Sequence, residues 1–127
     1  MNREILFKGQ TESDKRVFGS LVQSKDGKCY IIQQTDNPID ADHDHWHIKA
    51  PAYKVKPETV KQYTGQSDIN ANMVWDGSKI KNVDNGLIQT VYWNNDKSAW
   101  YCKYDGQDRV ASLCDSLGNL NEVIVEP

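Results

Sequence analysis

Short runs of β-branched and aromatic residues alternate with turn-forming residues along most of the chain. The turn signals recur about every eight to twelve residues, a spacing typical of all-β domains. Gly is favoured after Asp or Asn in tight hairpins because it adopts the positive φ that such turns need. Three segments carry this signal: Lys25-Asp26-Gly27, Asp84-Asn85-Gly86 and Asp105-Gly106. The pattern therefore predicts a mainly β fold of short antiparallel strands.

The first half of the chain predicts an antiparallel sheet over residues 1–65. In RVFGSLVQ, period-two alternation places Val17 and Leu21 on one face and Phe18 and Val22 on the other. A turn of helix is expected within Pro57–Gln62, because Pro suits the first helical position. The residues 36–44 are expected to form a polar loop. The predicted strands are Ile5–Phe7, Arg16–Gln23, Cys29–Gln34, Trp46–Lys49 and Tyr53–Val55.

The second half, residues 66–127, predicts a small, SH3-like, partly open β-barrel packed on the first sheet. Short strands joined by tight turns suit a barrel, because closure removes exposed sheet edges. We expect these strands to form a five-stranded meander. The candidates are Val74-Trp75, Lys79–Val83, Leu87–Trp93, Ser98–Tyr104, Arg109–Cys114 and Leu120–Val125.

Composition narrows the class of protein. The chain has 127 residues, an apolar fraction of 38% and a net charge of −3. No apolar run reaches the ~18 residues of a membrane span, and the N-terminus lacks a signal-peptide pattern, so a cytoplasmic location is expected. Lys and Arg are scattered along the sequence, which lowers the expectation of nucleic-acid binding. The three cysteines, Cys29, Cys102 and Cys114, have no metal-site or disulfide-framework spacing.

All three histidines fall in one segment, Asp40 to His47. On a strand, His43, His45 and His47 would share a face. Alternate positions are about 6.6–6.8 Å apart, so two imidazoles can reach one zinc ion together with a distant carboxylate or water. The alternative is a solvated loop leading into a strand, and we favour it. No cofactor is expected.

Aromatic residues crowd one predicted hairpin: Tyr92, Trp93, Trp100, Tyr101 and Tyr104. Such residues stack nucleobases or bind peptides in some small β domains, but they also build cores. We assign the tryptophans mainly to the core and expect any working face to lie near them. The candidate binding residues are Trp75, Asp76, Trp93 and Trp100.

Several ordered blocks resemble the YopX family of phage and prophage proteins: Arg3–Gly9, Val17–Leu21, Gly27–Ile32, Val55–Gly65 and Asn121–Ile124. The resemblance covers nearly the whole chain and implies a mainly β architecture with a barrel-like second half. It implies no activity, because the family has no established biochemical function.

One segment departs from the family pattern. Trp75, Asp76 and Gly77 fit it, whereas Ser78 and Lys79 replace an expected acidic residue and an apolar residue. Any role of that second acidic group is therefore in doubt here.

No catalytic motif is present, so we expect a non-catalytic binding or assembly module of a mobile element. A protein partner is favoured over single-stranded nucleic acid because the chain is acidic overall. A metal-dependent enzyme using His43, His45 and His47 is a further alternative. Self-association is expected through a β edge or an aromatic patch, with Ile5–Phe7 and Val123–Val125 as the candidate edge strands.

Overall fold

The computed structural model describes residues 5–34, 39–42, 45–48 and 50–124, with the backbone alone for 39–42 and 45–48. These residues form a mainly β protein, as predicted. The chain divides into two compact units, Met1–Gln62 and Tyr63–Pro127. The strand β7 (Lys61–Ser67) runs through this boundary, which the sequence analysis placed between residues 65 and 66.

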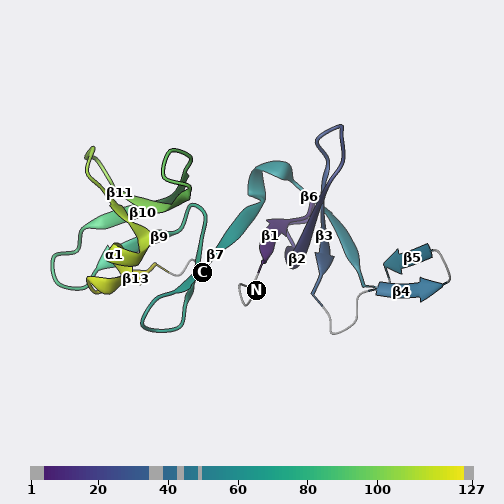
Figure 1. Ribbon diagram of the computed structural model, residues 1–127, viewed down its shortest axis with the longest axis horizontal. Coiled ribbons are helices and arrows are strands. Elements are labelled where there is room, and N and C mark those ends of the chain that lie inside the picture. The colour runs from purple at the N-terminus through teal and green to yellow at the C-terminus, as the bar shows by residue number, and fades with distance from the viewer. Residues whose placement is uncertain (1–4, 35–38, 43–44, 49, 125–127) are drawn as a thin grey trace. The chain divides into compact units, whose positions relative to one another are not determined.

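The first unit is built on an antiparallel sheet with the strand order β6-β3-β2-β1-β7 (Figure 1). A short 3₁₀ helix, η1 (Pro57–Thr59), precedes β7 and lies within the segment where a helical turn was expected. The other strands of this sheet are β1 (Phe7–Gln10), β2 (Arg16–Gln23), β3 (Cys29–Gln33) and β6 (Ala52–Val55).

Alternation along β2 sets the core of this unit as predicted. Val17 is buried and Leu21 packs against the same cluster, while Phe18 and Val22 are exposed. The cluster is completed mainly by buried apolar side chains of β3 and β6, including Ile31 and Val55. Gly27 has a φ of 87° in the predicted hairpin turn between β2 and β3.

The segment 36–44, predicted as a loop, contains a strand. A separate two-stranded hairpin, β4 (Ile39–Asp42) and β5 (His45–Ile48), lies between β3 and β6 in sequence. The prediction was wrong because the abundant Asp residues outweighed the apolar–polar alternation of Ile39-Asp40-Ala41-Asp42. That alternation is the ordinary strand pattern.

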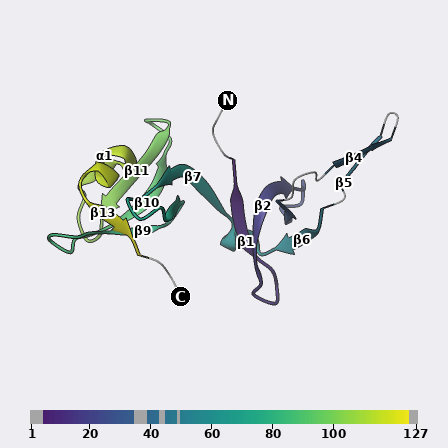
Figure 2. The same cartoon turned by 90° about the horizontal axis from the view of Figure 1, so that it is seen from below.

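The second unit contains a five-stranded antiparallel sheet with the order β12-β11-β10-β9-β13 (Figure 2). The first four strands form a meander, but the last strand returns to pair with β9, which the sequence did not predict. Its strands are β9 (Lys79–Asn82), β10 (Ile88–Asn94), β11 (Ala99–Tyr104), β12 (Val110–Ser112) and β13 (Asn121–Val123). The strand β8 (Met73–Trp75) pairs with β7 instead of joining this sheet. Across the described residues, β12 and β13 form the two edges of an open sheet.

The segment predicted as the strand Arg109–Cys114 ends two residues early, and the helix α1 (Leu113–Gly118) follows it. The Ser112 side chain accepts a hydrogen bond from the Asp115 N–H at 3.2 Å, which caps the helix. Leu113 and Ser116 are buried and Leu117 packs against the core, so the apolar spacing follows a helix and not a strand. The helix was not predicted because the strand propensity of Val110–Ser112 outweighed the capping signal of Ser112.

The first strand begins at Phe7, whereas Ile5–Phe7 was predicted. It pairs with β2 on one side and with β7 on the other, so it is not the exposed edge that we expected for self-association. The last strand, β13, pairs only with β9 and remains an edge. Within the described residues, β1 therefore offers no free edge of the kind that this prediction assumed.

Candidate binding face

Strict alternation gives the five-stranded sheet of the second unit two different faces. One face carries the buried residues Ile80, Val91 and Cys102, and Leu113 of α1 packs onto them. Burial raises the pKa of the Cys102 thiol to about 11, which marks this side as a dry core. The opposite face carries polar and aromatic side chains that are half-buried or exposed, and we call it the polar face. Its central residues are Lys79, Lys81, Thr90, Tyr92, Tyr101 and Lys103.

The strand register arranges the polar face in rows. Tyr92 of β10 lies directly opposite Tyr101 of β11. In the next row, Thr90 is flanked by Lys79 on one side and Lys103 on the other. Directly opposed residues have Cβ atoms about 4.5–5.5 Å apart, so these pairs are close neighbours on the surface. Two tyrosines thus lie beside a row that contains two lysines.

One cluster of hydrogen bonds holds part of this face in place. Lys79 Nζ lies 2.6 Å from Thr90 Oγ1 and 3.0 Å from Asp105 Oδ2, and Thr90 Oγ1 donates to Asp105 Oδ1 at 2.8 Å. Hydrogen bonds from Lys79 and then Thr90 lower the pKa of the Asp105 carboxyl, so it stays ionised at neutral pH. No ion pair joins Lys81 or Lys103 to any described residue. These two ammonium groups are therefore the ones available to a ligand.

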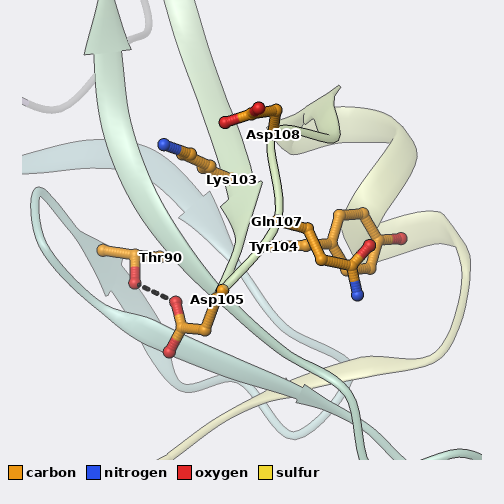
Figure 3. Close-up of a pocket in the computed structure, with 7 residues that line it drawn as sticks. Thr90, Lys103, Tyr104, Asp105, Gln107 and Asp108 are labelled. Carbon is orange, nitrogen blue, oxygen red and sulfur yellow. Dashed lines mark hydrogen bonds between the residues drawn. The ribbon is translucent and has the colours of Figure 1, made fainter.

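A pocket of about 380 Å³ lies at the end of the face, around the turn between β11 and β12. Figure 3 shows Thr90 and Asp105 on one side of it, with Lys103 and Asp108 above and Tyr104 and Gln107 opposite. The guanidinium of Arg109 lies 4.7 Å from the centre of the Tyr104 ring, which supports that wall. The lining offers donors and acceptors together, and two carboxylates disfavour a free phosphate. The pocket suits a neutral polar group such as a sugar hydroxyl or a base edge.

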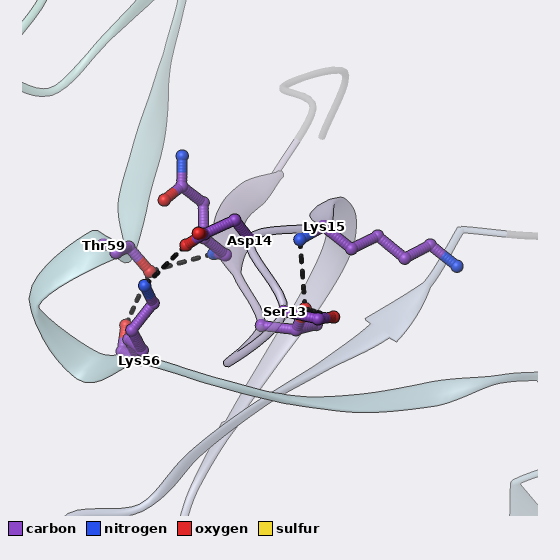
Figure 4. Close-up of polar contacts among 7 residues, drawn as sticks. Ser13, Asp14, Lys15, Lys56 and Thr59 are labelled. Carbon is purple, nitrogen blue, oxygen red and sulfur yellow. Dashed lines mark hydrogen bonds and ion pairs between the residues drawn. The ribbon is translucent and has the colours of Figure 1, made fainter.

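A second group of polar contacts lies in the first unit (Figure 4). Lys56 Nζ lies 2.7 Å from Asp14 Oδ1, Thr59 Oγ1 donates to the Lys56 carbonyl at 2.6 Å, and Gln10 N–H donates to Thr59 Oγ1 at 2.9 Å. The hydrogen bond and charge of Lys56 lower the pKa of Asp14. These contacts tie the turn after β1 to η1, and each partner is used within the protein. We assign this group a structural role.

The tryptophans predicted as binding residues are mostly in the core. Trp75 is 7% exposed and packs against Tyr63, with the ring centres 5.5 Å apart and the ring planes tilted by 49°. Trp100 is 9% exposed, and Trp93, at 44%, packs edge-on against it at 5.2 Å. Asp76 is half-buried in the turn after β8. The structure therefore brings Trp93 and Trp100 together, and by strand parity both belong to the core side of the sheet.

Sequence reasoning missed the lysines of the polar face. They stand at positions 79, 81 and 103, and only the pairing of β9, β10 and β11 gathers them. The tyrosines were recognised as part of an aromatic cluster, and alternation along YW and WY already separated Tyr92 and Tyr101 from Trp93 and Trp100. What the sequence lacked was the register that joins the two tyrosines.

The histidines belong to the first unit. His45 and His47 lie in β5, and His43 lies outside the described residues. Among the side chains that the structure describes, which exclude those of β4 and β5, no group of three His, Cys, Asp or Glu residues is arranged to hold a metal ion.

A scan against protein-family models and a search of curated proteins found no match to this chain. In the described part of the chain, no helix is long and apolar enough to cross a membrane.

Proposed function

We propose that the protein is a non-catalytic binding module and that its polar face binds single-stranded nucleic acid. The observation that carries the proposal is the pairing of Tyr92 with Tyr101 beside Thr90 and Lys103. Proteins that bind single strands without sequence preference combine aromatic rings, on which bases stack, with cations that follow the phosphates. The polar face combines both on adjacent strands.

The rings and the ammonium groups have separate roles in this proposal. Tyr92 and Tyr101 are half-buried, which limits the side-chain entropy lost on binding. Stacking on such rings contributes about 1–3 kcal/mol per base. Lys81 and Lys103 would contact phosphates, while Lys79 is shared with Asp105. The neighbouring pocket would receive a sugar or a base edge.

The net charge of −3 was our reason for favouring a protein partner, but local charge decides such contacts. Within about one Debye length, roughly 8–10 Å, the ligand senses the face itself more than the distant acids. The face and its rim carry four positive groups, Lys79, Lys81, Lys103 and Arg109, against three negative ones, Asp105, Asp108 and Glu122, the last of which pairs with Lys81 across β13 and β9. The local balance is weakly positive, so binding is expected to be modest and to fall with salt.

We further propose that the protein belongs to a phage or prophage and is related to the YopX family. A cytoplasmic protein of a phage or prophage, related to the YopX family and SH3-like in its second unit, would encounter single-stranded intermediates during replication or recombination. The fold supports this assignment only through its mainly β character. The competing explanation is that the same face binds a protein, and oligothymidine binding by Tyr101 variants distinguishes the two.

Replacing Tyr101 with Leu is expected to weaken binding of a fluorescein-labelled oligothymidine by about 5–150-fold, whereas Tyr101→Phe keeps most of the affinity. Leu retains an apolar side chain on the sheet but cannot stack, and Phe retains the ring. Fluorescence anisotropy at low salt measures both. Tyr30→Leu, in the first unit, is the matched control and should bind like the unmodified protein. Equal affinity for all three variants, or no binding at all, would leave a protein partner as the better explanation.

Salt dependence gives an independent prediction. If the two lysines without an ion pair, Lys81 and Lys103, neutralise phosphates, log K should fall with log salt concentration with a slope of about −1.4, from roughly 0.7 per contact. Lys103→Gln should make the slope shallower by about 0.7. Lys25→Gln, at the exposed turn after β2, should leave it unchanged. A slope that does not respond to Lys103→Gln would remove that lysine from the interface.

A further inference from the structure

The register of the β4–β5 hairpin places four potential metal ligands opposite one another. Asp42 pairs with His45, and Asp40 pairs with His47. The hairpin forms a two-stranded sheet of its own (Figures 1 and 2). The sequence had suggested only that two histidines share a strand face, with any carboxylate supplied from a distance. The backbone pairing supplies two carboxylates from the adjacent strand.

The alternation of residues along the two strands separates the hairpin into two faces of different chemistry. Directly opposed residues of an antiparallel pair lie on the same face, and so do residues two positions apart. One face therefore carries Asp40, Asp42, His45 and His47, and the other carries Ile39, Ala41, Trp46 and Ile48. All four positions of one face are metal-ligating residue types, and all four of the other are apolar.

The spacing of the four positions suits a single ion. Opposed Cβ atoms are about 4.5–5.5 Å apart and alternate positions along a strand about 6.6–6.8 Å apart. These positions form a small rectangle with two histidines on one strand and two aspartates on the other. Bonds from zinc to imidazole nitrogen and to carboxylate oxygen are both about 2.0–2.2 Å. The backbone register therefore gathers all four residues into one small area of the hairpin.

We propose that Asp40, Asp42, His45 and His47 bind one Zn²⁺ ion. Two imidazoles favour zinc over Mg²⁺ or Ca²⁺, which prefer oxygen ligands alone. Four protein ligands are typical of structural zinc sites, whereas catalytic sites keep one position open, so we expect a structural ion. This inference is independent of the polar face and agrees with a non-catalytic module.

Zinc would also supply stability that the hairpin lacks. A two-stranded hairpin is marginally stable by itself in water. The sequence also places two acidic residues, Asp40 and Asp42, on one short strand. A divalent cation would offset their charge and link the two strands.

Zinc binding by the full-length, tag-free protein tests the proposal. Calorimetry should give one Zn²⁺ per chain, and Co²⁺ in its place should show the intense visible absorption of a tetrahedral site. His45→Gln and Asp42→Asn should each weaken binding by more than the roughly 10–100-fold that loss of an outer-shell partner causes. His43→Gln and Asp44→Asn, in the same hairpin but outside the four positions, should bind zinc with unchanged affinity.

Three results would overturn the proposal. The first is the absence of stoichiometric zinc binding. The second is an equal loss from His43→Gln and His45→Gln, which would indicate adventitious imidazole binding. The third is full affinity in the double variant Asp40→Asn/Asp42→Asn. Far-UV circular dichroism of each metal-free variant checks that the sheets are retained, so that a loss of zinc binding reports on the hairpin.

Discussion

Replacing Asp68 with Ala is expected to destabilise the protein by about 3 kcal/mol, because this carboxylate is 7% exposed and satisfies several donors at once. It accepts hydrogen bonds from the backbone N–H groups of Asn70 and Asn72 at 2.9 Å each and from the Asn72 side chain at 3.3 Å. It also accepts from the Val123 N–H at 2.8 Å, which joins the loop after β7 to β13. Ala leaves these donors without their partner.

Chemical denaturation measures this effect. Asp84→Ala is the matched control, because Asp84 lies exposed in the turn between β9 and β10, and its loss should change stability by less than about 0.5 kcal/mol. A similar free energy of unfolding for the two variants would show that the Asp68 hydrogen bonds contribute little.

The pH dependence of stability should also reveal the contribution of the Asp68 carboxylate. Burial by itself raises the pKa of Asp68, but hydrogen bonds from Val123, Asn72 and Asn70 together lower it below its usual value. A carboxyl whose pKa is lower in the folded state stabilises the protein above its unfolded pKa of about 3.9. That contribution is lost as the pH falls through the folded pKa. The stability difference between the unmodified protein and Asp68→Asn should therefore shrink below about pH 4, and a constant difference would contradict the assignment.

Replacing Gly19 with Ala should be equally severe, by about 3 kcal/mol or more, because the sheet leaves no room for a methyl group. A Cβ atom at Gly19 would lie 1.8 Å from the Ile32 carbonyl oxygen and 3.1 Å from the Gln34 nitrogen. Both are backbone atoms of the neighbouring chain segment, so they cannot move aside as a flexible side chain does. The pairing of β2 with β3 must shift to accept the substitution.

Gly118 offers a matched control for this substitution. A Cβ there meets no heavy atom within 4 Å, and Ala favours the helix α1 over Gly by about 0.5–1 kcal/mol. Thermal unfolding should show a large fall in Tm for Gly19→Ala and an unchanged or slightly higher Tm for Gly118→Ala. Equal Tm values would mean that β2 and β3 adapt without cost.

The local features of the fold were predictable because they depend on neighbouring residues. Gly27, Gly86 and Gly106 all have positive φ values in the turns where tight hairpins were expected. Burial alternates along β2 as the sequence indicated. The helix α1 was missed although Ser112 and Asp115 stand at capping positions, because a strand pattern runs directly into it. The strand pattern and the helix cap make opposite predictions for the same segment, and only the packing of Leu113 and Leu117 against the core decides between them.

The candidate sites depended on long-range pairing, which sequence patterns do not encode. Lysines 79 and 103 are 24 positions apart and meet on either side of Thr90 only through the register of β9, β10 and β11. For the proposed zinc site, the alternating histidines were recognised in the sequence, but Asp40 and Asp42 were assigned to a loop and so were not recognised as ligands. The tryptophans were named as candidate binding residues because they are large and aromatic. The same large apolar surface explains why Trp75 and Trp100 are buried.

The most direct test of the proposed function is to map oligothymidine binding residue by residue on the isotopically labelled protein by NMR. The account predicts that the largest shifts fall on the ring and ammonium signals of Tyr92, Tyr101 and Lys103, with smaller changes at the pocket around Asp105. Signals of the core face, such as those of Val91 and Cys102, should change little. Shifts confined to the first unit, or no shifts at concentrations where anisotropy reports binding, would contradict the assignment of the polar face as the binding surface.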